Sequence, residues 1–340
     1  MPSFLFSVAV LCAVLLAWGI TPSVRRVALR FGAIDRPDKP RKPHKKSTAL
    51  WGGLATGLVV LLSIVFMSLV ADRDLSVFAL AGFSLGVVVL LVGGLLDDRF
   101  DLPAWVQFLF PLTAALLVVF TGTSIERVTN PSGGAPLELG AFGVPLGVLW
   151  LLTVTYAMKL LDGLDGLVAG LTVVGAVLIA LLAGSEAYFQ PLIAILALMI
   201  AGAHLGFLPY NHEGTIFLGE AGSTIAGFSL GVLAILSGAK VATAATALAI
   251  PLIDIGLVVL RRVAAGRSPF KGDTAHLHFQ LLNLGFTPRA VVRLIWATGA
   301  LFGLLALSLQ TKGKIFLFIF LAAVISLLSY VAWIKSRRAV

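Results

Sequence analysis

The stretch "LDGLDGLVAGLTVVGAVLIALLAG", residues 161–184, places two aspartates directly before a long apolar run. A bilayer core of roughly 30 Å needs about 20 apolar residues to be crossed by a helix. The run from residue 164 to 184 therefore predicts a membrane-spanning helix. Asp162 and Asp165 predict a polar junction where that helix begins.

The composition extends this prediction to the whole chain. Of 340 residues, 59% are hydrophobic and 12% are charged, and the mean hydropathy is +1.03. These values are typical of an integral membrane protein and exclude an ordinary soluble domain. We expect an all-α membrane protein with about eleven transmembrane helices in a single polytopic domain, residues 1–340. The predicted spans are residues 3–22, 49–71, 76–96, 104–121, 142–160, 164–184, 187–208, 223–238, 241–260, 291–310 and 315–334.

The Lys and Arg residues predict the orientation of these spans. Twenty of the 25 lie on the side of the first loop, residues 23–48. Cytoplasmic loops carry the excess of Lys and Arg. We therefore expect the N-terminus outside, the C-terminus in the cytoplasm, and residence in the cell inner (plasma) membrane. Most acidic residues fall on the same side, although the rule does not require this, so a shared cytoplasmic cleft is predicted.

Two acidic motifs follow apolar runs. In "GGLLDDRFDLP", residues 93–103, Asp97 and Asp98 leave a span together. They indicate a site for a cation or a phosphate, or else a solvated helix end. In "KLLDGLDGLVAG", residues 159–170, Asp162 and Asp165 are three positions apart, and the glycines between and after them allow close approach to the backbone. A short turn between helices is the alternative.

Two further motifs combine charge with small or basic residues. In "YNHEGTIFLGEAGST", residues 210–224, small residues surround Glu220 just before a new span. This pattern indicates a helix N-terminus that binds an anion, or else a helix N-terminus that is simply capped. In "RRVAAGRSPFKGDTAHLHFQ", residues 261–280, basic residues precede His276 and His278. Without a nearby cysteine a zinc pair is weakly supported, so phosphate or sugar binding fits better.

Together with "GAIDRPDKPRKPHKKSTALWGGLA", residues 32–55, these motifs and their order resemble a known family. The chain resembles the polyprenyl-phosphate N-acetylhexosamine-1-phosphate transferases, which include the phospho-N-acetylmuramoyl-pentapeptide transferase of peptidoglycan synthesis. The resemblance covers nearly the whole chain. It implies that a polyprenyl phosphate attacks the β-phosphate of a UDP-N-acetylhexosamine, which gives a polyprenyl-diphosphate sugar and UMP at the first membrane step of cell-envelope glycan synthesis.

The resemblance also implies partners and a cofactor. The substrates would be a polyprenyl phosphate, such as undecaprenyl phosphate, and a UDP-sugar. The short HxH form of the histidine motif, as in the enzymes that use UDP-N-acetylglucosamine, favours a simple UDP-N-acetylhexosamine. Membrane lipids and a homodimer are compatible with it, and nucleic acid is not expected. Mg²⁺ is the implied cofactor.

The site residues that the resemblance implies fall into three groups. The catalytic group is Asp97, Asp98, His276 and His278. The substrate-binding group is Lys42, His44, Lys159, Asp162, Asp165, Asn211, Arg267 and Asp273. The predicted metal ligand is Glu220.

The chain departs from the family at three places. Glu220 stands where the family usually has Asp, Tyr156 and Lys159 stand where it has a pair of Asn, and Phe279 replaces a third histidine. One alternative is therefore another nucleotide donor, or metal-free chemistry in which the Lys159 ammonium takes the place of Mg²⁺. A non-catalytic lipid-phosphate binder is a further alternative. The basic loop at residues 35–46 is expected to border the mouth of the cleft.

Overall fold

A computed structural model describes residues 3–36, 47–70, 76–130, 133–186, 188–238, 241–264, 266 and 276–338. Four predicted substrate-binding residues, Lys42, His44, Arg267 and Asp273, lie outside these ranges. The described chain is almost entirely helical, as the composition predicts.

The elements occur in the following order. The helices are α1 Ser3–Phe31, α2 Gly52–Val70, α3 Val77–Phe100, α4 Ala104–Phe120, α5 Gly143–Leu161, α6 Leu167–Ala183, α7 Pro191–His212, α8 Gly219–Leu236, α9 Val241–Ala247, α10 Ala249–Ala264, α11 Leu277–Asn283, α12 Pro288–Ser308 and α13 Thr311–Arg338. A short 3₁₀ helix, η1 Gly140–Phe142, precedes α5. The strands are β1 Ile34–Asp35, β2 Thr48–Ala49, β3 Arg127–Val128 and β4 Leu137–Glu138, and they form two antiparallel pairs, β1 with β2 and β3 with β4.

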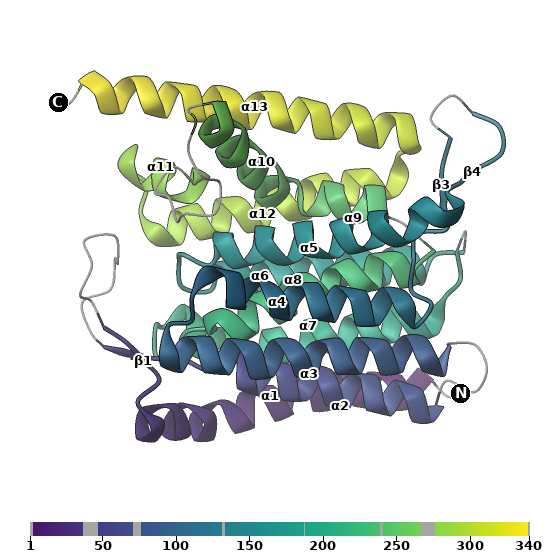
Figure 1. The fold of residues 1–340 in the computed structure, drawn as a ribbon, viewed down its shortest axis with the longest axis horizontal. Helices are drawn as coiled ribbons and strands as arrows, with labels where there is room; N and C mark the ends of the chain where they lie inside the picture. The colour runs from purple at the N-terminus through teal and green to yellow at the C-terminus, as the bar shows by residue number, and fades with distance from the viewer. Residues whose placement is uncertain are drawn as a thin grey trace.

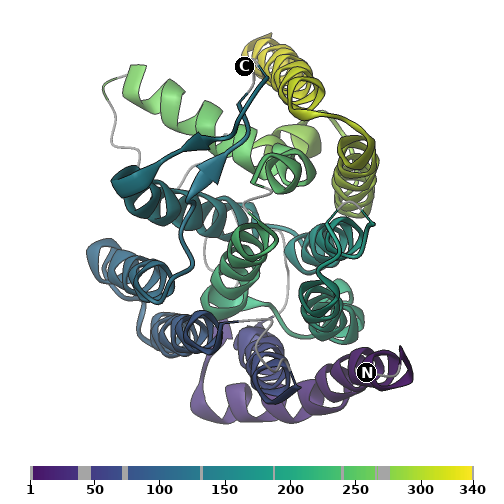
Figure 2. The same cartoon turned by 90° about the vertical axis from the view of Figure 1, so that its right-hand side faces the viewer.

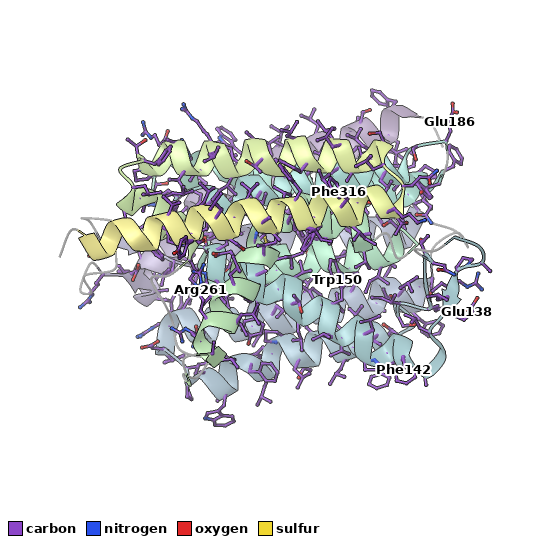
Figure 3. All side chains as sticks on the ribbon, turned by 90° about the horizontal axis from the view of Figure 1, so that it is seen from above. Glu138, Phe142, Trp150, Glu186, Arg261 and Phe316 are labelled. Atoms are coloured by element: carbon purple, nitrogen blue, oxygen red, sulfur yellow. The ribbon has the colours of Figure 1, made fainter. Side chains whose placement is uncertain are left out.

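The helices confirm the predicted class. Within the described residues, eight helices are long and apolar enough to cross a membrane, and α9 with α10 would make a ninth, bent by 83°. Each of the eleven predicted spans overlaps a helix. Nine of them overlap the helices just counted, and the other two overlap α4 and α6, which have 17 residues each. Large apolar side chains such as Phe142 and Phe316 lie exposed on the outside (Figure 3). The count of eleven and the orientation stay predictions.

The end of the first span differs most from its prediction. The first span was predicted to end at residue 22, but α1 continues past Pro22 to Phe31. Val24 and Ala28 are four positions apart and both are buried, so one face of this extension packs on the protein. Arg25 donates a hydrogen bond from Nε to the carbonyl of Thr215 at 3.0 Å. These contacts hold the extra turns as a helix where the sequence suggested a loop.

The helix α8 lies at the centre of the bundle. Of its apolar window, 83% is buried, and Figure 2 shows it surrounded by the other helices. Small residues make this possible, because a Cβ on Gly53 would overlap Gly222 and a Cβ on Gly94 would overlap the backbone of Ala221. Small residues at helix contacts let backbones approach closely. The C-terminal part of α3 and the N-terminal parts of α2 and α8 therefore meet at close range.

The two ends of the bundle carry different features. Figure 1 shows the N-terminus and the β3–β4 pair at one end, and the C-terminus, β1 and α11 at the other. In Figure 3, Glu138 and Glu186 lie at the first end and Arg261 lies toward the second. The acidic and histidine motifs all belong to the second end, since they sit at the end of α3, between α5 and α6, at the start of α8 and at the start of α11.

The contact of Gly94 with Ala221 predicts the effect of a single added methyl group. We expect Gly94→Ala to destabilise the protein by about 1–3 kcal/mol, because the helices must separate or shift to admit the Cβ. Gly19→Ala is the matched control, since a Cβ at Gly19 meets no atom within 4 Å. Thermal unfolding in detergent measures both. Equal melting temperatures for the two variants would contradict the packing described here.

Candidate active site

The aspartate pair joins the end of α3 to the start of α8. Oδ1 of Asp98 accepts the backbone N–H of Glu220 at 2.9 Å. Gly219, with φ of +73°, lies directly against this carboxylate, and a Cβ there would overlap Oδ2 of Asp98. Oδ1 of Asp97 accepts the N–H of Leu102 at 2.9 Å and so closes the turn after α3. Backbone amides at a helix start are suited to bind a carboxylate.

Lys159 neutralises Glu220 inside the same cluster. Its Nζ lies 2.6 Å from Oε1 of Glu220 and donates to Oε1 of Gln107 at 2.9 Å. Both charged side chains are only 15% exposed. A buried ion pair needs such additional hydrogen bonds, because desolvation of the two charges is costly. Lys159 therefore connects α4, α5 and α8 around one pair of opposite charges.

The DGLDG turn is held by Asn211 from the end of α7. Oδ1 of Asn211 accepts the N–H of Gly166 at 3.1 Å, and Nδ2 donates to the carbonyl of Ile216 at 3.1 Å. Gly166 has φ of +80°, which favours glycine. Both ends of this buried amide are engaged within the protein, so the substrate-binding role of Asn211 stays a prediction. The structure supports a positioning role for it.

Asp162 ends α5 and lies beside the other acids. Burial raises the pKa of Asp162 to about 8, and the negative charges of Glu220 and Asp165 add to this. A carboxyl group that is neutral near pH 7 gains charge readily when a cation approaches. Asp162 is therefore sensitive to any positive group that enters the site.

The two histidines lie at the start of α11 and reach the DGLDG turn. Nδ1 of His276 is 2.8 Å from Oδ2 of Asp254, and the ring of His276 stacks on that of His278 with centroids 5.9 Å apart. His278 is fully buried, and burial lowers its pKa to about 4. A Cβ on Gly163 would collide with its Nε2. The neutral ring of His278 thus packs on the turn, and its catalytic role stays a prediction.

The basic loop begins and ends beside Glu220. The strands β1 and β2 pair Ile34 with Ala49, so they bring the two ends of the loop together. Phe217 donates its N–H to the carbonyl of Ala49 at 2.8 Å, and Gly52 donates to the carbonyl of Phe217 at 2.9 Å. Residues 37–46 themselves lie outside the described ranges, but their flanks are joined to the segment that precedes Glu220. The place of the loop at the mouth of the cleft stays a prediction.

A pocket opens between α3, α4 and α8 next to the charged cluster. Its space is about enough for one water molecule, and its polar lining residues include Asp97, Gln107 and Glu220. Leu90, Phe110 and Pro111 line its apolar side. The pocket thus places carboxylate and amide groups beside apolar side chains at the edge of the charged cluster.

The donor atoms fit a divalent cation in type but not in arrangement. Carboxylate oxygens are the ligands that Mg²⁺ prefers, and Oδ2 of Asp98 is buried without a hydrogen-bond partner. However, among the described residues no three His, Cys, Asp or Glu side chains are grouped to hold a metal ion. Oε1 of Glu220, the predicted ligand, faces the Lys159 ammonium. The arrangement of these residues therefore does not fit a divalent cation bound at Glu220.

Comparisons with known proteins identify the family. The model of glycosyl transferase family 4 matches residues 80–238, which include the aspartate pair, the DGLDG turn and Glu220. The chain is 33% identical to a probable undecaprenyl-phosphate N-acetylglucosaminyl 1-phosphate transferase of Bacillus subtilis, over 89% of this chain and 85% of that protein. It therefore belongs to glycosyl transferase family 4, in the superfamily of polyprenyl-phosphate N-acetylhexosamine-1-phosphate transferases.

Two other relatives show the breadth of this similarity. A decaprenyl-phosphate N-acetylglucosaminephosphotransferase of Mycolicibacterium smegmatis is 32% identical, over 84% of this chain and 77% of that protein. A phospho-N-acetylmuramoyl-pentapeptide-transferase of Halalkalibacterium halodurans is 31% identical, over 85% of this chain and 91% of that protein. The names of these relatives thus specify different polyprenyl phosphates and different sugars.

Sequence reasoning missed two residues of the site. Gln107 lies within an apolar run of α4, and no pattern around it predicted that it would bind Lys159. Asp254 is an acidic residue inside a predicted span, which marks a functional candidate. Its partner, His276, could not be identified because it lies 22 positions away across residues 261–275.

The raised pKa of Asp162 predicts how stability depends on pH. The folded state holds the proton of Asp162 more tightly than the unfolded state does. The contribution of this proton to the stability of the folded protein is therefore complete below about pH 4 and is lost as the pH rises toward 8. We expect the wild type to lose stability relative to Asp162→Asn between about pH 4 and pH 8. Thermal unfolding in EDTA measures this, with Glu138→Gln as the control at the other end of the bundle. Parallel pH profiles for the wild type and Asp162→Asn would contradict the pKa.

Proposed function

We propose that this protein transfers N-acetylhexosamine-1-phosphate, with N-acetylglucosamine as the favoured sugar, from a UDP-sugar to a polyprenyl phosphate. The products are a polyprenyl-diphosphate sugar and UMP, and the reaction is the first membrane step of a cell-envelope glycan. Family membership and the names of the relatives support the reaction. The observation that carries it is the joining of Asp98 to the amide of Glu220, which gathers the acidic motifs at one end of the bundle.

In this reaction an oxygen of the lipid phosphate attacks the β-phosphorus of the UDP-sugar. A new P–O bond forms there, and the bond from the β-phosphorus to the bridging oxygen breaks, so UMP leaves with that oxygen. Catalysis of phosphoryl transfer depends mainly on alignment and on stabilisation of negative charge. The residues are therefore assigned by where they can align the phosphates or carry positive charge.

The pocket beside Asp97 is the proposed place of the lipid phosphate. Leu90 and Phe110 in its lining would contact the first part of the polyprenyl chain once the pocket widens to admit it, and Asp97 lines the same pocket. Asp98 is the proposed base, since its Oδ2 is an acceptor without a partner among the described residues. His276 and the DGLDG turn, which His278 joins, form the proposed side for the nucleotide and the sugar diphosphate.

We place the site at the cytoplasmic face of the inner membrane, in a single domain. The distribution of Lys and Arg supports this orientation, because most of them lie on the side of the first loop. The acidic motifs lie at the end of the bundle that carries β1 and the C-terminus (Figure 1). A homodimer rests on the resemblance alone.

The first test is transfer of labelled sugar phosphate from UDP-N-acetylglucosamine to undecaprenyl phosphate by the purified protein. We expect Asp98→Asn and His276→Ala to lower turnover by about 100-fold or more, with little change in melting temperature. Glu138→Gln is the matched control, because Glu138 pairs with Arg127 on the exposed β3–β4 hairpin at the other end. Binding of the lipid phosphate without turnover in the wild type would instead indicate a non-catalytic binder.

Whether Mg²⁺ is required depends on Lys159. The resemblance predicts Mg²⁺ bound through Glu220, but the ammonium of Lys159 already lies 2.6 Å from Oε1 of Glu220. A fixed positive charge in a partly buried site can stabilise charge that develops on phosphate oxygens. The geometry therefore favours Lys159 as the cation at this position.

This assignment predicts a difference in sensitivity to EDTA. We expect the wild type to keep activity in excess EDTA, with a loss of less than about tenfold. The double variant Lys159→Asn with Glu220→Asp, which restores the residue types usual in the family, should lose activity in EDTA and regain it with Mg²⁺. Wild-type activity that EDTA abolishes would show that Mg²⁺ is needed despite Lys159.

A further inference from the structure

Asp254 is a buried carboxylate that the proposed chemistry does not yet use. It lies in α10, and both Asp254 and His276 are 4% exposed. Oδ2 of Asp254 lies 2.8 Å from Nδ1 of His276, and Oδ1 accepts the backbone N–H of Leu277 at 2.8 Å. One carboxylate thus binds both the imidazole and the first amide of α11.

These two contacts determine which nitrogen of His276 carries the proton. A carboxylate accepts hydrogen bonds and does not donate them, so the proton between His276 and Asp254 belongs to Nδ1. The neutral imidazole then has its lone pair on Nε2. Because Leu277 holds the other oxygen, the carboxylate cannot rotate without breaking a second hydrogen bond.

The position of Asp254 in the fold makes this a rigid support. Asp254 lies in the first turns of α10, just after the 83° bend between α9 and α10, and α10 packs against α5 and α13. The short helix α11 is separated from α10 in the sequence by residues 265–276. The Asp254 contacts therefore join the histidine motif directly to the helical bundle.

The histidine motif in turn reaches the DGLDG turn. The ring of His276 stacks on His278 at 13° between planes, and His278 packs against Gly163 between the two aspartates of the turn. A path of direct contacts runs from Asp254 through His276 and His278 to Gly163. A displacement of the His276 ring would be transmitted to the turn by packing.

We propose that Asp254 is a positioning residue that holds His276 with its proton on Nδ1 and so directs Nε2 toward the substrate. Asp254 acts through His276 and does not touch the reacting atoms. The functional part of this inference rests on the proposed transferase function, whereas the tautomer is a property of the protein alone. The two parts can therefore fail separately.

The tautomer is tested without any substrate. The chain contains five histidines, so ¹⁵N-histidine spectra of the full-length protein in detergent are simple, and the signal lost in His276→Ala identifies His276. We expect the Nδ1-protonated form in the wild type and a mixture or the other tautomer in Asp254→Asn. An Nε2-protonated His276 in the wild type would overturn the proposal, whatever the activity.

The functional role is tested by kinetics with UDP-N-acetylglucosamine and undecaprenyl phosphate. We expect Asp254→Asn to lower kcat by about 10- to 100-fold with a smaller effect on KM, as for partners that orient a histidine in other sites. Asp254→Glu should restore part of the loss, and Asp254→Asn should add nothing in the His276→Ala background. A multiplicative loss in that background, or kcat of Asp254→Asn within twofold of the wild type, would overturn the role.

Thr287→Ala controls for simple destabilisation near the same helices. Oγ1 of Thr287 accepts the N–H of Ala290 at 3.3 Å and caps α12, which follows α11. Loss of such a cap lowers stability by about 0.5–2 kcal/mol. We expect Thr287→Ala to lower the melting temperature without changing the His276 tautomer. A tautomer change in Thr287→Ala would show that the spectrum reports on destabilisation, which overturns the assignment to Asp254.

Discussion

The hydrogen bond from the Glu220 amide to the Asp98 carboxylate is the contact on which the site depends. It brings together two helix ends that are 122 positions apart in the sequence. The contact exists only because glycines allow the helices to approach, with Gly219 against the carboxylate and Gly94 against Ala221. The same approach brings the flanks of the basic loop to the segment before Glu220 and places Glu220 within reach of Lys159.

Charge balance is the second constraint. The described cluster contains Asp97, Asp98, Asp162 and Glu220, with the Lys159 ammonium paired to Glu220, yet the proposed substrates bring further negative charge. Charges of one sign cannot accumulate in a partly buried site without protonation or a counter-charge. The raised pKa of Asp162 is one response to this imbalance, and the ion pair of Lys159 with Glu220 is another. The charged groups that align the phosphates must therefore also affect the protonation of the buried carboxyl groups, such as that of Asp162.

The sequence predicted the class and the motifs well, because membrane spans and acidic residues beside them have few alternative explanations. Each predicted span coincides with a helix or with the bent pair α9 and α10, although α1 extends nine residues beyond its predicted end and α11 lies where a loop was predicted. Family membership followed from five motifs in order. The contacts of Gln107 with Lys159 and of Asp254 with His276 could not be predicted, because the sequence around a polar residue in an apolar helix does not indicate which distant residue it contacts.

The sequence by itself determined that the chain is an all-α membrane protein of this transferase superfamily, because hydropathy and motif order are local properties of the chain. The tertiary structure alone decided which motif residues face one another. It showed that Asn211 and His278 contact the DGLDG turn, and that Lys159 forms an ion pair with Glu220. The physical reason is that these contacts join residues from different helices, and their geometry follows from how closely small residues let those helices pack.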